Sequence, residues 1–213
     1  MKFVRNKSIT LLELIIAIAL LSVIVMGFSS IELFSRHHVL TADRRAKLQN
    51  EVSFALEHIS KNISRAIGNE RINGANSVVG VAPNVSIIAY IDANQDGSRQ
   101  DPANNIDYYI AYRYDDNGPN AHQLRYCPRC ANANCNFNQC TPGGGEVISS
   151  QITAFIPFKP VVNPGIDDTL SDNFVQIGVT ACWDVLNTAD CGSPDNPAVS
   201  MRTRISMPSV STH

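Results

Sequence analysis

Proline and glycine are nearly missing from the first third of this 213-residue chain. All 11 prolines lie at or after Pro83, and 10 of the 12 glycines lie at or after Gly74. Both residues interrupt helices, so their scarcity permits an unusually long helix at the N-terminus. Cysteine is absent before Cys127, and the residue after Cys130 is not histidine, which excludes c-type haem attachment at that C-x-x-C pair.

Charge is also sparse, and the pattern of a catalytic centre is missing. Charged residues make up 17% of the chain, and the basic ones form no patch that would predict a nucleic-acid partner. The five histidines are scattered, and no serine or cysteine lies in a recognised nucleophile motif. We therefore expect a protein that is not an enzyme.

The longest apolar run of the chain follows a short basic leader. Residues 1–8 carry three basic side chains, and Ile9–Phe28 contains a single charged residue, Glu13. A helix of this length extends about 30 Å, which matches the hydrocarbon thickness of a bilayer. Residues 9–28 are therefore predicted to span a membrane.

Glu13 requires an explanation within this apolar run. A carboxylate near the middle of a bilayer helix costs roughly 2.5–3.5 kcal/mol, so it marks a functional site with a partner. Cleavage between Ser8 and Ile9 would create an α-amino group four residues before Glu13. The carboxylate of one subunit would then neutralise the amine of its neighbour. A secretory signal peptide cut near Ala17–Ala19, or a plain signal anchor, does not explain the carboxylate.

The residues around this bond form a specific pattern. They are Lys7, Ser8, Ile9, Thr10, Leu11, Leu12, Glu13, Leu14 and Ile15. This segment resembles the cleavage and N-methylation motif of type IV pilins and type II secretion pseudopilins. In that motif a basic leader ends in a small residue, and an apolar first residue, Thr, two aliphatic residues and Glu follow. Ser8 replaces the usual Gly, and Ile9 replaces the commonest Phe.

The resemblance implies a processing route and a set of partners. Prepilin peptidase would remove residues 1–8, and Ile9 would be N-methylated. Residues 9–28 would first anchor the chain in the cytoplasmic membrane, with the head outside the cytoplasm, and then enter a filament core beside other pilins or pseudopilins. Glu13 would be the assembly residue. Loss of the leader leaves 14 basic against 19 acidic residues, again without a predicted nucleic-acid partner.

Beyond the membrane segment, a helical pattern gives way to strands. Apolar residues recur at helical spacing through residues 29–67, and Gly68 is a stop signal. The helical positions are Val52, Leu56, Ile59, Ile63 and Ala66. Strands are predicted at Val85–Ile91, Ile106–Tyr114, His122–Tyr126, Ile152–Phe158, Phe174–Trp183 and Ser200–Met207, with loops between them. The expected fold is α+β, with the amphipathic half of the helix packed on an antiparallel sheet in a head formed by residues 68–213.

The order of these features is similar to that of minor pilins of the PilW type and of the J-type pseudopilin. The resemblance implies a minor pilin that joins a pilus tip or initiation complex, with a J-type pseudopilin of type II secretion as the alternative. A different class also fits the same residues. It is a membrane-anchored, calcium-dependent adhesin or metal-binding surface protein that does not polymerise.

The six cysteines predict disulfides in an exported protein. Four of them, Cys127, Cys130, Cys135 and Cys140, lie within fourteen residues, and Cys182 and Cys191 flank a shorter segment. A four-thiolate zinc site is an alternative for the first group, but an oxidising compartment favours disulfides. Cys182–Cys191 is the favoured single pair, and the pairing of the other four stays open.

An acidic segment offers a candidate calcium site. Asp92, Asn94, Asp96 and Asp101 resemble the first half of a calcium loop, with Gly97 at its turn. The twelfth position holds Ala103 instead of Glu, and the flanking segments read as strands, so this is not an EF-hand. An ordinary polar turn explains the same residues and is slightly favoured.

Overall fold

The computed structural model describes residues 10–66, 79–82, 86–91, 93, 108–116, 118, 120–130, 135, 140, 145–158 and 174–206. Within these residues it contains one long α-helix, a short 3-10 helix at Thr188–Asp190 and eight strands in two antiparallel sheets. The α+β class predicted from the sequence is therefore confirmed. The chain divides into two compact units, Met1–Asp43 and Arg44–His213.

Helix α1 (Leu11–Ile63) contributes to both units. In the second unit it buries one face, which consists of Leu48, Val52, Ala55, Leu56, Ile59 and Ile63. All five apolar positions predicted from helical spacing, including Ala66 just beyond the helix, are buried. The Ala66 N–H donates to the Ile63 carbonyl at 2.9 Å, a tightened last turn that is common at helix ends. Gly68, the predicted stop, lies outside the described residues.

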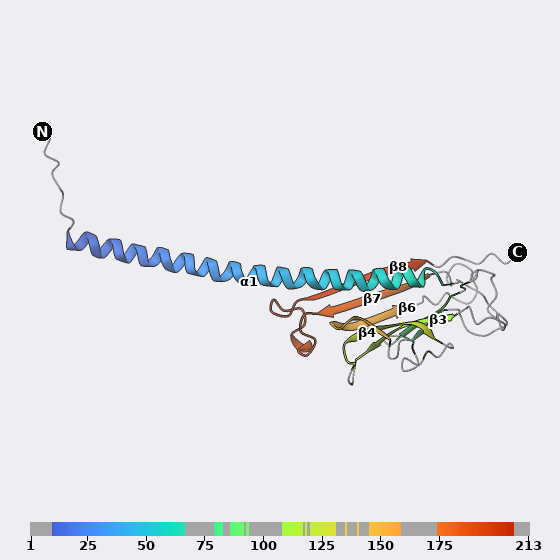
Figure 1. Cartoon of the computed structure of the whole chain (residues 1–213). Coiled ribbons are helices and arrows are strands. Elements are labelled where there is room, and N and C mark those ends of the chain that lie inside the picture. The colour runs from blue at the N-terminus through green and yellow to red at the C-terminus, as the bar shows by residue number, and fades with distance from the viewer. Residues whose placement is uncertain are drawn as a thin grey trace, which may run out of the picture. The chain divides into compact units, whose positions relative to one another are not determined.

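Five strands form the first sheet in the order β1-β2-β3-β4-β5. They are β1 (Val79–Ala82), β2 (Ser86–Ile91), β3 (Tyr108–Asp115), β4 (Gln123–Cys130) and β5 (Glu146–Ser149). Two of them, β3 and β4, are labelled in Figure 1. Strands β3 and β4 pair as an antiparallel hairpin, and Gly118, which lies between them, adopts a φ of 84°. Strands β1 and β5 lie in segments that the sequence predicts as loops. Each is only four residues long and lies at a sheet edge, so alternation cannot be recognised in it.

Three strands form the second sheet in the order β6-β7-β8. They are β6 (Ile152–Phe158), β7 (Phe174–Cys182) and β8 (Ala198–Ser206). Pro157 is tolerated because β6 is an edge strand, where a missing N–H can face away from the ladder. The sequence predicts a single sheet, and this detail is wrong. Alternation identifies strands that have one buried face, but it does not show which strands pair.

Both sheets and the helix share one hydrophobic core in the second unit. The helix contributes its buried face, the first sheet contributes Ile87, Ile110, Tyr112 and Leu124 among others, and the second sheet contributes Phe155, Val175, Ile177 and Val179 among others. Because the strands of both sheets bury alternate residues in the same core, they carry the same sequence pattern.

The first sheet is covered on its other face as well. There Ala111 of β3 packs with the four clustered cysteines, and Ile88 and Tyr109 pack against this group. Strand β4 reaches Cys130, four residues beyond its predicted end at Tyr126. The register shifts between Tyr109 and Ala111 opposite this extension. Such a bulge accommodates Pro128, which breaks the usual strand pattern.

Candidate functional site

The first turn of α1 is closed by Thr10 and Glu13. Glu13 Oε2 accepts the Thr10 backbone N–H at 2.9 Å and the Thr10 hydroxyl at 3.1 Å. The Glu13 backbone N–H lies 3.3 Å from Thr10 Oγ1 and donates to it. These contacts form a capping box, in which an N-cap Thr and a Glu three residues later satisfy each other's backbone donors. The Thr-x-x-Glu spacing that signals this box is present in the sequence, so Glu13 has a capping role in addition to the assembly role predicted for it.

The helix after this cap presents apolar side chains to the outside on all sides. Its large hydrophobic residues from Leu11 to Phe28 are each more than half exposed. Among the described residues, α1 is the helix that is long and apolar enough to cross a membrane. A helix that is apolar all round is suited to lipid or to other apolar helices. This segment is compatible with a single membrane anchor.

Serine hydroxyls within this segment and directly after it donate hydrogen bonds to backbone carbonyls of the same helix. The hydroxyl of Ser22 donates to the Ala19 carbonyl at 2.7 Å, and that of Ser29 donates to the Val25 carbonyl at 2.9 Å. Ser30 makes the same kind of bond to Met26 at 3.0 Å. Hydroxyls paired in this way need no water, so they do not oppose transfer of the helix into an apolar environment.

Charged residues return at Glu32 and Arg36, which form an ion pair one helical turn apart. Exposed apolar side chains continue around this pair at Ile31, Leu33 and Phe34, and beyond it at Val39 and Leu40. Exposed apolar side chains therefore occur along about 45 Å of helix, from Leu11 to Leu40 at 1.5 Å per residue, with Glu32 and Arg36 among the last of them. This length exceeds the hydrocarbon layer of a bilayer, which is about 30 Å thick.

Several predicted site residues lie where the structure gives no description. Ser8 and Ile9, the predicted cleavage and methylation positions, precede the described residues. Asp92, Asn94, Asp96 and Asp101 of the predicted calcium loop also lie outside them. The processing and calcium assignments therefore stay predictions.

The six cysteines form three disulfides in the second unit. Cys182 is joined to Cys191, the pair that the sequence favours. Cys127 is joined to Cys140 and Cys130 to Cys135, which selects one of the three pairings left open by the sequence.

The Cys127, Cys130, Cys135 and Cys140 group, here called the cysteine cluster, is compact. Its four Sγ atoms all lie within 4.8 Å of one another, and all four residues are buried. Two of them belong to β4 and two to the segment that follows it. A group of four sulfurs at these distances can hold a metal ion when it is reduced.

A second cluster, which sequence spacing does not indicate, forms around His58. The Tyr112 hydroxyl lies 2.9 Å from His58 Nδ1 and accepts a hydrogen bond from Asn62 Nδ2 at 2.9 Å. The Tyr126 ring packs edge-on against His58 and is stacked on Tyr112. Burial lowers the pKa of His58 and raises that of Tyr112 far above its usual range. Both shifts favour the neutral form of the side chain.

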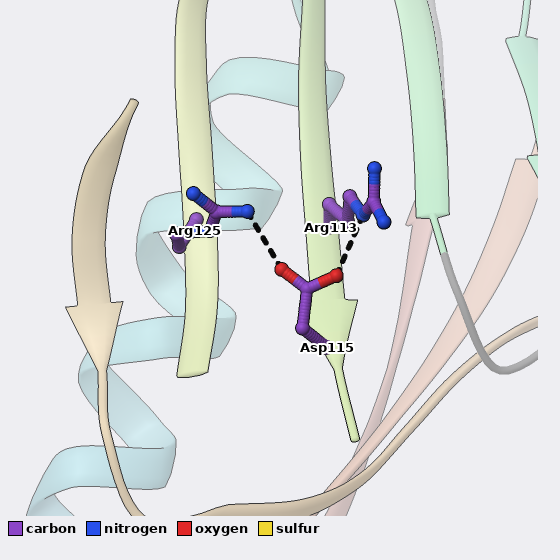
Figure 2. Close-up of polar contacts among 3 residues, drawn as sticks. All are labelled: Arg113, Asp115 and Arg125. Atoms are coloured by element: carbon purple, nitrogen blue, oxygen red, sulfur yellow. Dashed lines mark hydrogen bonds and ion pairs between the residues drawn. The ribbon is translucent and has the colours of Figure 1, made fainter. Parts of the chain in front are cut away.

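A third group lies at the end of the β3–β4 hairpin. Figure 2 shows the Asp115 carboxylate between two arginines, with its oxygens 2.8 Å from Arg113 Nε and 2.7 Å from Arg125 Nη2. Arg113 and Arg125 face each other directly across the two strands. Like charges in such a pair repel, and the shared carboxylate offsets this repulsion. This arrangement has a structural explanation and predicts no ligand.

Comparison with known proteins returned no matching family model, no matching curated protein and no matching solved structure.

Proposed function

We propose that this chain is a minor pilin-like filament subunit, processed by prepilin peptidase and assembled into a pilus tip or initiation complex. The observation that carries the proposal is the N-terminal part of α1. It is apolar on all sides, it holds one carboxylate in its first turn, and its sequence continues into a helical segment that a β-rich unit buries on one face. The basic leader and the Lys7–Ile15 motif agree with this role.

The capping box leaves Glu13 able to bind a second partner. Oε2 receives both Thr10 contacts, and among the described residues Oε1 makes no hydrogen bond. One oxygen can therefore hold the helix start while the other accepts the α-amino group of a neighbouring subunit. In an apolar bundle such a charged pair is much stronger than in water, which would offset the cost of placing Glu13 there.

The length of the exposed apolar surface supports a filament role over a simple anchor. A bilayer would cover about 30 Å of helix, and the apolar side chains as far as Leu40 extend beyond that length. Large apolar side chains left in water are unfavourable, whereas packing against neighbouring helices would remove them from it.

Two alternatives remain from the sequence. A J-type pseudopilin shares every feature on which the proposal rests. An anchored, calcium-dependent adhesin would keep its leader and would use Asp92, Asn94, Asp96 and Asp101. For that class, millimolar calcium should raise the melting temperature of the protein, and an Asp92→Ala, Asp96→Ala double variant should abolish the shift.

Processing is the decisive experiment. The chain should be expressed with and without a prepilin peptidase, and its N-terminus should be determined by mass spectrometry. We expect a mature chain that begins at methylated Ile9 only when the peptidase is present. Ser8→Gly should be cut at least as well as the natural chain, and Ser8→Leu should accumulate as precursor. A mature start elsewhere, or an uncut leader in both strains, would contradict the proposal.

A further inference from the structure

The cysteine cluster has a chemical capacity that a filament role does not use. Its four sulfurs come from two short spacings, Cys127-x-x-Cys130 and Cys135-x4-Cys140, and both fall within the usual range for zinc ligands or close to it. We propose that, when both disulfides of the cluster are reduced, the four thiolates bind one Zn²⁺ ion. The loop would then have two closed forms, one held by disulfides and one held by zinc.

The distances allow a four-thiolate site with little rearrangement. Tetrahedral zinc has Zn–S bonds of about 2.3 Å, which place neighbouring sulfurs about 3.8 Å apart. All four Sγ atoms of the cluster already lie within 4.8 Å of one another. Reduction lengthens the two bonded S···S separations, and it does not require the other sulfurs to approach from afar. In the disulfide-bonded protein the four ligand atoms are therefore already close to the spacing that zinc requires.

The surroundings also suit a structural zinc site. The cysteines are between 0% and 7% exposed, and Ala111, Ile88 and Tyr109 pack around them. An apolar shell of this kind keeps water from competing as a ligand. Cys127 and Cys130 are fixed by β4 on either side of its register shift, so half of the ligand set lies on a sheet.

Reduction of the two disulfides of the cluster requires a dithiol reductant. Each disulfide takes up two electrons and two protons from one dithiol, which is itself oxidised to a disulfide. Four cysteine thiols result. Binding of Zn²⁺ then displaces four protons to solvent and gives a tetrathiolate with a net charge of −2. Zinc is not oxidised or reduced in this exchange, and renewed oxidation of the four thiolates would release it.

Zinc is the metal that fits this ligand set best. Four thiolates in tetrahedral geometry select zinc or an iron centre among the common metals. Zn²⁺ has no redox chemistry of its own and is the usual ion in closed four-cysteine sites. The other disulfide, Cys182–Cys191, supplies only two sulfurs and does not belong to the cluster. It is therefore an internal control.

The experiment uses the full chain in detergent micelles, so it does not depend on filament assembly. After reduction with excess dithiol and its removal without air, the protein is titrated with Co²⁺ and then with Zn²⁺. We expect one Co²⁺ per chain with the absorption of a tetrahedral tetrathiolate, followed by its displacement by Zn²⁺. The oxidised protein should bind neither ion in this way.

Variants separate the cluster from the remaining thiols. Cys127→Ser and Cys135→Ser should each weaken zinc binding by more than the roughly 10–100-fold that losing a hydrogen-bond partner of a ligand costs. A Cys182→Ser, Cys191→Ser double variant should bind zinc like the natural chain. No metal uptake by the reduced protein, or equal uptake in all variants, would overturn the proposal.

Circular dichroism tests the proposal even if reduction unfolds the head, because it measures whether zinc restores the folded strands. If the reduced chain loses its strand signal, stoichiometric Zn²⁺ should restore it in the natural chain and in the Cys182→Ser, Cys191→Ser variant. Cys127→Ser should not recover under the same conditions. A reduced chain that stays unfolded with zinc would equally overturn the proposal.

Discussion

Glu13 Oε2 accepts two hydrogen bonds from Thr10, from its backbone N–H at 2.9 Å and from its hydroxyl at 3.1 Å. The carboxylate therefore has a role within its own chain as well as the assembly role proposed for it. The two roles depend on different properties. Capping needs an acceptor oxygen at this position, whereas pairing with an amine needs a negative charge.

Glu13→Gln should separate these two roles. Glutamine also serves at this position of a capping box, so the helix should begin as before, but the amine of a neighbouring subunit loses its counter-charge. We expect normal membrane insertion and greatly reduced entry into filaments, measured by fractionation of sheared cells. Thr10→Ala should do the reverse. It should weaken the cap by about 0.5–2 kcal/mol and leave assembly largely intact. Filaments that contain Glu13→Gln at the normal level would contradict the charge-pairing role.

The loop closed by Cys182 and Cys191 should depend on Asn196 as well as on its disulfide. Asn196 is 4% exposed, and its Oδ1 accepts the Asp184 N–H at 2.7 Å. Its Nδ2 donates to the carbonyls of Asp184 and Asn187. Asn196→Ala strands these backbone groups, so we expect a loss of roughly 1–3 kcal/mol in the free energy of unfolding.

Chemical denaturation should measure this effect against two references. Cys182→Ser with Cys191→Ser should cost about 2–3 kcal/mol in the chain-entropy model. Leu186→Ala lies in the same loop, and its side chain is 91% exposed, so it should change stability by no more than about 0.5 kcal/mol. Equal stability of Asn196→Ala and Leu186→Ala would show that the side-chain bonds of Asn196 do not stabilise the loop.

The sequence predicts more of the fold than of the candidate site. The buried helix positions and all six predicted strands are present, because each element keeps a regular apolar period. Periodicity carries no information on strand pairing, so it does not predict the division into two sheets. Periodicity also does not predict contacts between side chains that are far apart in the sequence. Tyr112 and His58 are 54 residues apart and meet only when β3 packs on the helix.

His58 should make the head less stable in acid. Burial lowers its pKa below 6.5, and the charge of Lys61 acts in the same direction, whereas Glu146 partly offsets the effect. As the pH falls below about 6.5, the unfolded chain therefore takes up this proton before the folded chain does. The free energy of unfolding therefore does not depend on His58 titration above that pH. It falls as the pH is lowered from there, and it stops falling once the pH is below the pKa of His58 in the folded protein.

Urea denaturation across this pH range tests the prediction. His58→Asn should flatten the profile in this window, because the residue that titrates is gone. Tyr112→Phe keeps the ring but removes the hydroxyl, and it should leave most of the acid sensitivity because burial is the main cause of the shift. A profile unchanged by His58→Asn would assign the acid sensitivity to other groups.

Asp115 should be the most sensitive position of the β3–β4 hairpin. Its carboxylate contacts Arg113 and Arg125, whose side chains are 45% and 11% exposed, respectively. Asp115→Asn keeps the size of the side chain but leaves two facing arginines without their counter-charge. Removing one partner of a buried ion pair costs about 3–5 kcal/mol, and the partial exposure of Arg113 should bring the loss to the lower end of that range. Arg113→Ala should cost less than about 1 kcal/mol, because exposed ion pairs contribute little.

Thermal denaturation of the natural chain and the two variants at low and high salt measures both effects. Salt should partly rescue Asp115→Asn, since screening weakens the repulsion between the arginines. If Asp115→Asn is as stable as Arg113→Ala at low salt, the shared carboxylate is not needed to hold the two strands together.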